Sequence, residues 1–235
     1  MLDARRNDPV PVIGACLPVE ALASHRDWLF ELDRDLELQT FHEAAVLDGD
    51  WETPAAEAVK VLDGFQGRLG VHGPFWGFSI DSLDPEIRKV VTRRMMQGLD
   101  VCARTGATLM VIHSPYNRWS AQNFGQLPGA SERLMEMVAD TLTPVLKRAE
   151  EEGVVLAMEN IQDVDPATRR ALCAHFDSPS LKLSIDTGHA QIAHVTDGAP
   201  PVDYFVRDAG AALAHVHLQD CDGYADRHWS LGEGT

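Results

Sequence analysis

The fold of this chain is decided by one stretch, Leu-Lys-Leu-Ser-Ile-Asp-Thr-Gly-His, which covers residues 181–189. Leucine and isoleucine alternate with polar residues from Leu181 to Ile185, and this alternation predicts a β-strand with one apolar face. The same alternation places Asp186 on the opposite face, where the strand ends. His189 follows three residues later. A carboxylate and an imidazole at the end of an apolar strand indicate a polar site rather than ordinary core.

Length and composition predict one domain over residues 1–235. The chain has 235 residues, of which 45% are hydrophobic, and single α/β barrels commonly take about 200 to 250 residues. Its four cysteines are scattered without a C-x-x-C pair, which argues against a disulfide framework or a zinc knuckle. No apolar signal core and no run of about 18 apolar residues occurs. We therefore expect a cytoplasmic protein with no membrane partner.

The charge balance argues against nucleic acid as a partner. The chain carries 36 acidic against 20 basic residues, a formal net charge of −16 spread along the sequence. Such a surface repels polyanions unless basic residues gather in one place. We expect a small molecule as the partner, and a second copy of the chain in a homo-oligomer is left open.

Strand-like and helix-like segments alternate along the chain, which predicts right-handed βαβ units and a parallel sheet. No G-x-G-x-x-G follows the first strand, so a (β/α)8 TIM barrel is favoured over a dinucleotide-binding sheet. A kink or break is expected at Pro144, inside the helix predicted for residues 131–152. The predicted strands cover residues 10–17, 36–42, 68–75, 108–115, 154–161, 181–186 and 213–218.

Only a loop is predicted after the seventh strand, up to Thr235. An eighth strand with its helix would need about 30 further residues. We therefore expect a C-terminally incomplete barrel with seven of the eight strands and the last strand-helix unit missing.

Five successive strands end in residues that can bind a metal ion. In a barrel the carboxyl ends of all strands open on one face, so residues far apart in sequence converge there. Each alone has an ordinary structural reading, but unpaired buried charge costs several kcal/mol and is normally avoided. A mixed set of imidazoles and carboxylates suits Zn²⁺ or Mn²⁺. The five residues are His72, His113, Glu159, Asp186 and His217.

The loop after the last strand adds two more candidates, Asp226 and His228. Their i, i+2 spacing lets both side chains reach the same side of an extended segment. Aromatic residues that follow the strand ends could stack on a bound substrate or simply pack in a lid; they are Phe75, Trp76, Tyr116, Trp119 and Trp229.

Together these motifs resemble the sugar phosphate isomerase/epimerase family of the xylose isomerase-like TIM-barrel superfamily, which also contains the endonuclease IV-type apurinic-site nucleases. The resemblance covers nearly the whole chain. It rests on His-Gly-Pro-Phe at 72–75, Ile-His-Ser-Pro at 112–115, Met-Glu-Asn at 158–160, Asp-Thr-Gly-His at 186–189, His-Leu-Gln-Asp at 217–220 and Asp-Arg-His at 226–228.

The resemblance implies a divalent ion, Mn²⁺, Mg²⁺, Co²⁺ or Zn²⁺, bound by Glu159, Asp186 and His217. It implies an isomerase or epimerase of a sugar or sugar phosphate that works through an enediolate, with Glu159 as the acid/base residue. The family's fourth shared ligand, a glutamate on the eighth strand, has no counterpart before Thr235. Substrate binding or additional metal binding is implied for His72, His113, His189, Asp226 and His228.

Two alternatives remain open. One is a zinc-dependent phosphoesterase similar to the apurinic-site endonucleases, whose ligands up to the seventh strand all have a match here. The other is a truncated barrel with impaired catalysis, because the strand-eight glutamate is absent. The loops after the strands are acidic or neutral, for example Asp-Gly-Asp-Trp-Glu at 48–52, whereas a nuclease needs Lys and Arg along a groove. This favours the isomerase.

Overall fold

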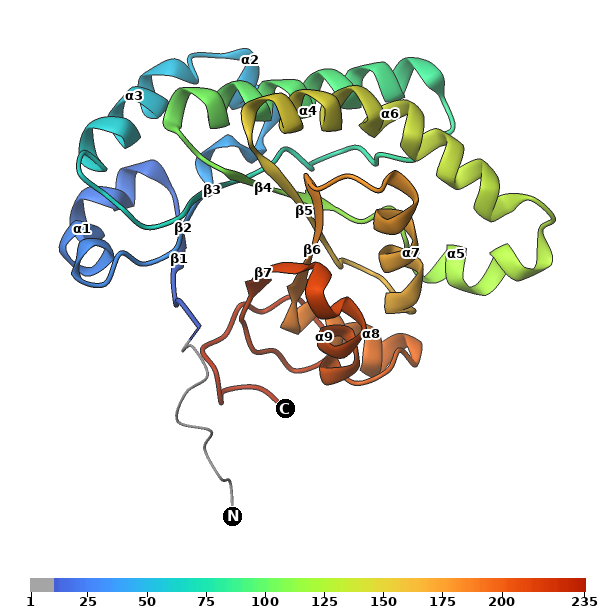
Figure 1. The fold of residues 1–235 in the computed structure, drawn as a ribbon. Coiled ribbons are helices and arrows are strands. Elements are labelled where there is room, and N and C mark those ends of the chain that lie inside the picture. Colours follow the sequence, from blue (N-terminus) through green and yellow to red (C-terminus); the bar gives the residue numbers. More distant parts are fainter. Residues whose placement is uncertain (1–10) are drawn as a thin grey trace.

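The computed structural model describes residues 11–235 of the chain. Seven strands form one parallel sheet whose spatial order follows the sequence, so β1 and β7 are its two edges within the described residues. The sheet curves into an arc with helices on its outer side (Figure 1). The strands are β1 (Ala15–Leu17), β2 (Leu36–Leu38), β3 (Leu69–His72), β4 (Leu109–His113), β5 (Val155–Glu159), β6 (Leu181–Asp186) and β7 (Leu213–His217).

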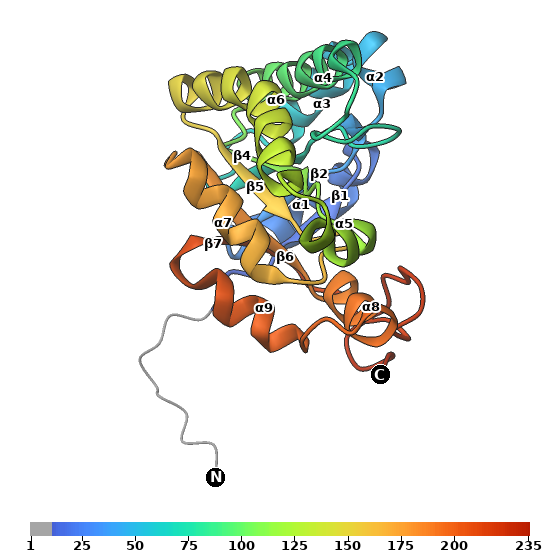
Figure 2. The same ribbon diagram turned by 90° about the vertical axis from the view of Figure 1, so that its right-hand side faces the viewer.

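The helices that connect the strands lie outside the arc, as the turned view in Figure 2 also shows. Among the described residues, no helix is long and apolar enough to cross a membrane. The α-helices are α1 (Leu22–Glu31), α2 (Ala44–Asp48), α3 (Glu52–Val61), α4 (Pro85–Thr105), α5 (Arg118–Asn123), α6 (Ala130–Glu152), α7 (Pro166–Phe176), α8 (Thr187–Asp197) and α9 (Val202–Ala209). Short 3-10 helices are η1 (Val19–Ala21), η2 (Thr40–His42), η3 (Phe124–Gln126) and η4 (Gly210–Ala212).

Local sequence signals explain where the long helices begin and end. Asp84 caps α4 by accepting a hydrogen bond from the backbone N–H of Glu86 at 2.8 Å, and Pro85 occupies the first helical position. Gly106 ends this helix in the left-handed conformation, with φ of 78°. The break considered at Pro144 does not occur, because α6 is continuous from Ala130 to Glu152.

The two faces of the sheet carry different side chains. Alternate side chains of β3, β4 and β5, such as Val71, Ile112 and Met158, pack in the main apolar core with the outer helices. The side chains between them point to the inner face, where Leu109, Val111 and Ala157 form a small separate cluster. The candidate site residues at the strand ends lie on this same inner face, because side chains alternate between the two faces along a strand. They therefore point into the concave side of the arc.

Six of the seven predicted strands are shorter in the structure, and only the sixth, Leu181–Asp186, has its predicted bounds. The first strand covers only Ala15–Leu17, and Val10 of the predicted range lies outside the described residues. The second ends at Leu38, because the chain turns into the 3-10 helix Thr40–His42. The hydroxyl of Thr40 accepts a hydrogen bond from the backbone N–H of Val19 at 2.9 Å, which ties this turn to the segment after β1.

Candidate metal centre

The structure brings the five strand-end residues together at one end of the arc, around the carboxylate of Glu159. This side chain is buried, with 1% of its residue surface exposed. Its Oε2 lies 3.8 Å from Nε2 of His72 and 3.7 Å from Nε2 of His113. Its Oε1 lies 2.7 Å from Nδ1 of His217 and 3.8 Å from Nδ1 of His189. One oxygen of Glu159 therefore faces His72 and His113, and the other faces His217 and His189.

Glu159 is shared by two groups of side chains that have the composition of a metal site. One donor group is His72, His113 and Glu159, and the other is Glu159, Asp186 and His217; in each, the ligand atoms lie within 4.8 Å of one another. The Nδ1–H of His72 donates to the carbonyl of Gly73 at 3.0 Å. This leaves its Nε2 lone pair facing Glu159, as a metal ligand requires. Imidazole and carboxylate donors of this kind fit Zn²⁺ or Mn²⁺.

Electrostatics keep Glu159 ionised. Burial raises its pKa, but the hydrogen bond from His217 and the electrostatic influence of the surrounding imidazoles, His217 first, outweigh burial and lower the pKa to about 2. For His113, burial lowers the pKa to about 3 against the opposing charge of Glu159. A neutral His113 and an ionised Glu159 are the protonation states in which both can bind a cation.

Asp186 is fully buried and is held by its neighbours on every side. Its backbone N–H donates to Oδ1 of Asn160 at 2.9 Å, and its carboxylate caps α8 by accepting from the N–H of His189 at 2.7 Å. The side-chain amide of Gln219 donates to both carboxylate oxygens, at 3.1 and 3.2 Å. Burial raises the pKa of Asp186, while the charge of His189 opposes the rise.

His189, Asp226 and His228 lie beside the two donor groups rather than within them. His189 donates from Nδ1–H to the carbonyl of Asn160 at 2.9 Å, and its Nε2 lies 3.3 Å from Asp226. Burial opposes protonation of His189, but Asp226 and Asp186 raise its pKa to about 9. The side chain of His228 is 66% exposed and contacts Asp226 at 3.1 Å, so the loop brings it to the rim only.

Three contributors to the site were missed by the sequence reasoning: Cys16, Glu37 and Gln219. Glu37 is 3% exposed on β2 and contacts Nε2 of His217 at 3.0 Å. The pattern Leu-Glu-Leu at 36–38 held a usable signal, because a glutamate between two buried leucines must occupy the inner face of the arc. Gln219 bonds Asp226 at 2.8 Å as well as Asp186, which no spacing rule would indicate.

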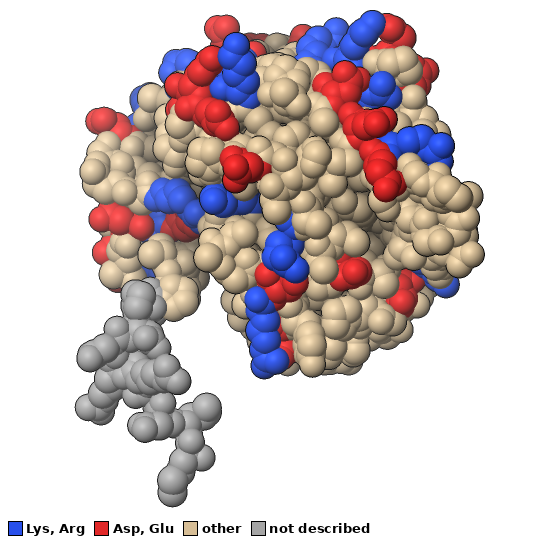
Figure 3. Space-filling view, turned by 45° about the vertical axis from the view of Figure 1, so that its right-hand side comes forward, with Lys and Arg blue, Asp and Glu red and all other residues tan. Residues whose placement is uncertain are grey.

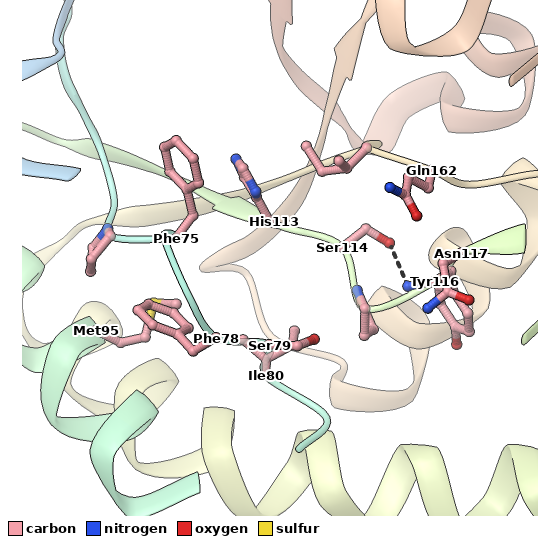
Figure 4. Close-up of a pocket in the computed structure, with 13 residues that line it drawn as sticks. Phe75, Phe78, Ser79, Ile80, Met95, His113, Ser114, Tyr116, Asn117 and Gln162 are labelled. Carbon is pink, nitrogen blue, oxygen red and sulfur yellow. Dashed lines mark hydrogen bonds between the residues drawn. The ribbon is translucent and has the colours of Figure 1, made fainter. Parts of the chain in front are cut away.

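A pocket opens beside His113, between the loops that follow β3, β4 and β5 (Figure 4). Its volume is about 270 Å³, and its wall combines aromatic rings with the side-chain amides of Asn117 and Gln162. Phe75 stacks on the His113 ring, with centroids 4.2 Å apart. Tyr116 also lines the pocket.

The three tryptophans named with these aromatic residues do not line the pocket. Trp76 and Trp119 are largely exposed, and Trp229 is partly exposed.

Comparison with known proteins agrees with this architecture. Residues 35–235 match the family described as the xylose isomerase-like TIM barrel. Among curated proteins, the uncharacterized protein MJ1311 of Methanocaldococcus jannaschii is 24% identical over 187 residues, which are 75% of this chain and 59% of that protein. The chain thus spans less than two thirds of the length of this relative.

Solved structures share the fold. The TTHB071 protein from Thermus thermophilus, in a crystal soaked with ZnCl2, is 28% identical with a TM-score of 0.72, covering 95% of this chain and 84% of that one. A D-tagatose 3-epimerase-like protein is 21% identical with a TM-score of 0.73, covering 95% and 82%. The second likeness shows the fold alone.

Proposed function

The chain belongs to the xylose isomerase-like TIM-barrel family, and from that premise we propose that it is a divalent-metal-dependent isomerase or epimerase. Its substrate is a sugar, a sugar phosphate or a related polyol, and the reaction passes through an enediolate. Metal binding is assigned to Glu159, Asp186 and His217, and acid/base catalysis to Glu159. Solved structures of epimerase-like proteins with the same fold support the proposal.

One observation carries the proposal: both oxygens of a single buried carboxylate, Glu159, face imidazole donors at the mouth of the arc. A divalent ion bound there supplies positive charge that acidifies a C–H bond beside a substrate carbonyl. Glu159 accepts that proton in its ionised state and returns it to the product. Asp186 stays fixed by Asn160 and Gln219 during these transfers.

The pocket beside His113 supports a hydroxyl-rich substrate. Asn117 and Gln162 offer amide donors and acceptors to hydroxyl groups, while Phe75 and Phe78 supply apolar surface. None of the residues that line this pocket is a lysine or an arginine. Lysine and arginine are interspersed with acidic residues on the face drawn in Figure 3, and the net charge is −16. These features favour a small hydroxyl-rich ligand over DNA.

The test is exchange of the substrate α-proton with solvent. Ketoses and ketose phosphates are incubated with the metal-loaded protein in ²H₂O, and deuterium at the carbon next to the carbonyl is measured by NMR. Glu159→Gln should abolish incorporation, because the amide cannot accept the proton. Glu57→Gln on the exposed side of α3 is the matched control. Exchange retained in Glu159→Gln would contradict the assigned role.

A zinc phosphoesterase is the second candidate, and the donor group of His72, His113 and Glu159 favours it. This group provides a place for a metal ion beyond the one bound by Glu159, Asp186 and His217. Elemental analysis of the purified protein separates the alternatives. About three zinc ions per chain would support the phosphoesterase, one ion the isomerase, and none a barrel with impaired catalysis.

A further inference from the structure

Glu37 is a buried carboxylate that faces the candidate metal centre from the opposite side of the arc. It lies on β2, whereas the histidine it contacts lies on β7, 180 residues later. The two strands are not neighbours in the sheet, so the contact crosses the concave inner face. Glu37 is not within the donor group formed by Glu159, Asp186 and His217, but it forms a further group of possible ligands with Cys16 and His217.

Polar atoms surround both oxygens of Glu37. Its Oε2 lies 3.0 Å from Nε2 of His217 and 3.0 Å from Nε2 of His215. Its Oε1 accepts a hydrogen bond from the amide of Gln39 at 2.8 Å, and the thiol of Cys16 lies 3.7 Å away. These contacts at both oxygens fix the orientation of the Glu37 carboxylate.

The two nitrogens of His217 face different carboxylates. Nδ1 points to Glu159, 2.7 Å away, and Nε2 points to Glu37, 3.0 Å away. Glu159 belongs to the donor group that also contains Asp186. Nδ1 donates its proton to Glu159 in this structure, and a divalent ion in that group would displace this proton. Nε2 would then keep the remaining ring proton, and Glu37 would accept it.

His215 lies two residues before His217 on β7, on the same face of the sheet, and also contacts Glu37. Arginine only donates hydrogen bonds, so the 2.9 Å contact between Nη2 of Arg68 and Nδ1 of His215 makes that nitrogen the acceptor. The proton of His215 then lies on Nε2, which is 3.0 Å from Oε2 of Glu37 but forms no hydrogen bond with it. Arg68 is itself fixed by Asp35 and by the carbonyl of Ala214 at 2.8 Å. Glu37 therefore has one hydrogen-bonded imidazole, His217, and a second imidazole, His215, in close contact.

We propose that Glu37 is a positioning residue that holds His217 as the Nε2–H tautomer, with its Nδ1 lone pair directed at the metal site of Glu159 and Asp186. The inference rests on the proposed metal centre and is independent of the sugar chemistry. Carboxylates that accept the second N–H of a metal-binding histidine orient the ring and raise its basicity. Loss of such a partner commonly weakens metal binding by about 10- to 100-fold.

The experiment measures Zn²⁺ affinity of the full chain by competition with a chromophoric chelator. Glu37→Leu removes the acceptor and should weaken Zn²⁺ binding by about 10- to 100-fold. Glu37→Gln keeps a neutral acceptor, so a smaller loss is expected because charge-assisted hydrogen bonds are about twice as strong as neutral ones. Glu57→Gln, an exposed charge change on α3, should leave the affinity unchanged.

A second readout reports the tautomer directly. Long-range ¹H–¹⁵N NMR of the zinc-loaded chain should show His217 protonated at Nε2 and without a proton on Nδ1. In Glu37→Gln the Nε2 proton signal should move upfield, because the acceptor has lost its charge. If Glu37→Leu does not fold, the affinity and ring spectrum of Glu37→Gln decide the matter.

Three results would overturn the inference. Unchanged Zn²⁺ affinity in both folded Glu37 variants would remove the positioning role, as would a His217 ring protonated at Nδ1 in the loaded protein. Loss of one whole zinc equivalent in both Glu37→Gln and Cys16→Ser would make Glu37 a ligand instead. If the wild-type chain bound no Zn²⁺, the metal centre itself would be contradicted, and the inference with it.

Discussion

Glu159 and His217 meet at 2.7 Å although their strands, β5 and β7, are separated by β6. The contact is made across the concave face, which shows how strongly the sheet curves at this end. Because the same histidine reaches Glu37 through its other nitrogen, its ring lies between two buried carboxylates. Such an arrangement concentrates negative charge that a cation would neutralise.

Metal addition should therefore raise thermal stability. A ligand that binds only the folded state at about 100 times its Kd adds about 2.7 kcal/mol. For a chain of this size, that corresponds to a rise in Tm of roughly 5–10 °C. Differential scanning calorimetry with Zn²⁺ or Mn²⁺, against the same protein with EDTA, measures it. The variant Asp186→Asn with His217→Gln is the control, and an equal rise in it would place the stabilising ion elsewhere.

Gly188→Ala should weaken metal binding although Gly188 is not a ligand. A Cβ at this position would overlap the side-chain amide of Gln219. That amide holds both Asp186 and Asp226, so its displacement disturbs the orientation of Asp186. A loss of up to about tenfold in Zn²⁺ affinity is expected, as for other partners of metal ligands.

Gly125→Ala is the matched control for this substitution. A Cβ at Gly125 meets no atom within 4 Å, so the affinity should be that of the wild type. Equal affinities in both variants would show that Gln219 does not orient Asp186.

Removal of the buried charge of Arg169 should lower the free energy of unfolding strongly. Arg169 is 1% exposed, donates to the carbonyl of Met158 at 2.8 Å and to that of Ser184, and lies 3.4 Å from Asp163. Arg169→Met leaves Asp163 buried without its counter-ion, a change that costs about 3–5 kcal/mol. Urea denaturation measures the free energy of unfolding.

The neighbouring Arg170 provides the comparison. Its contact with Asp208, at 3.1 Å, is half-exposed, and surface pairs of this kind contribute about 1 kcal/mol or less. Arg170→Met should therefore leave the free energy of unfolding nearly unchanged. If both variants lost the same stability, the cost at Arg169 would not come from the unpaired Asp163.

Acid should weaken the link between α2 and α4. Hydrogen bonds from Arg94 and Gln97 lower the pKa of Asp48 from 3.8 to about 2. Because the folded-state pKa is below the unfolded one, this contribution is present above about pH 4 and lost as the pH falls through 2. Thermal unfolding should show a smaller drop in Tm between pH 5 and pH 2.5 for Asp48→Asn than for the wild type. Equal drops would mean that the pair adds no pH-dependent stability.

The sequence by itself determined the seven parallel strands and the convergence of five strand-end residues. Both follow from local rules: apolar alternation predicts a strand, and parallel strands joined by helices have their carboxyl ends on one face. Val71 and His72 illustrate this, since adjacent residues of β3 face the outer core and the inner site.

Only the tertiary structure decided how these residues are held. The contact of Glu37 with His217, the link of Gln219 to both aspartates and the exposed position of His228 depend on side chains far apart in sequence or on the path of one loop. Residue spacing specifies which end of a strand a side chain occupies. The curvature of the sheet specifies which side chains meet across its inner face.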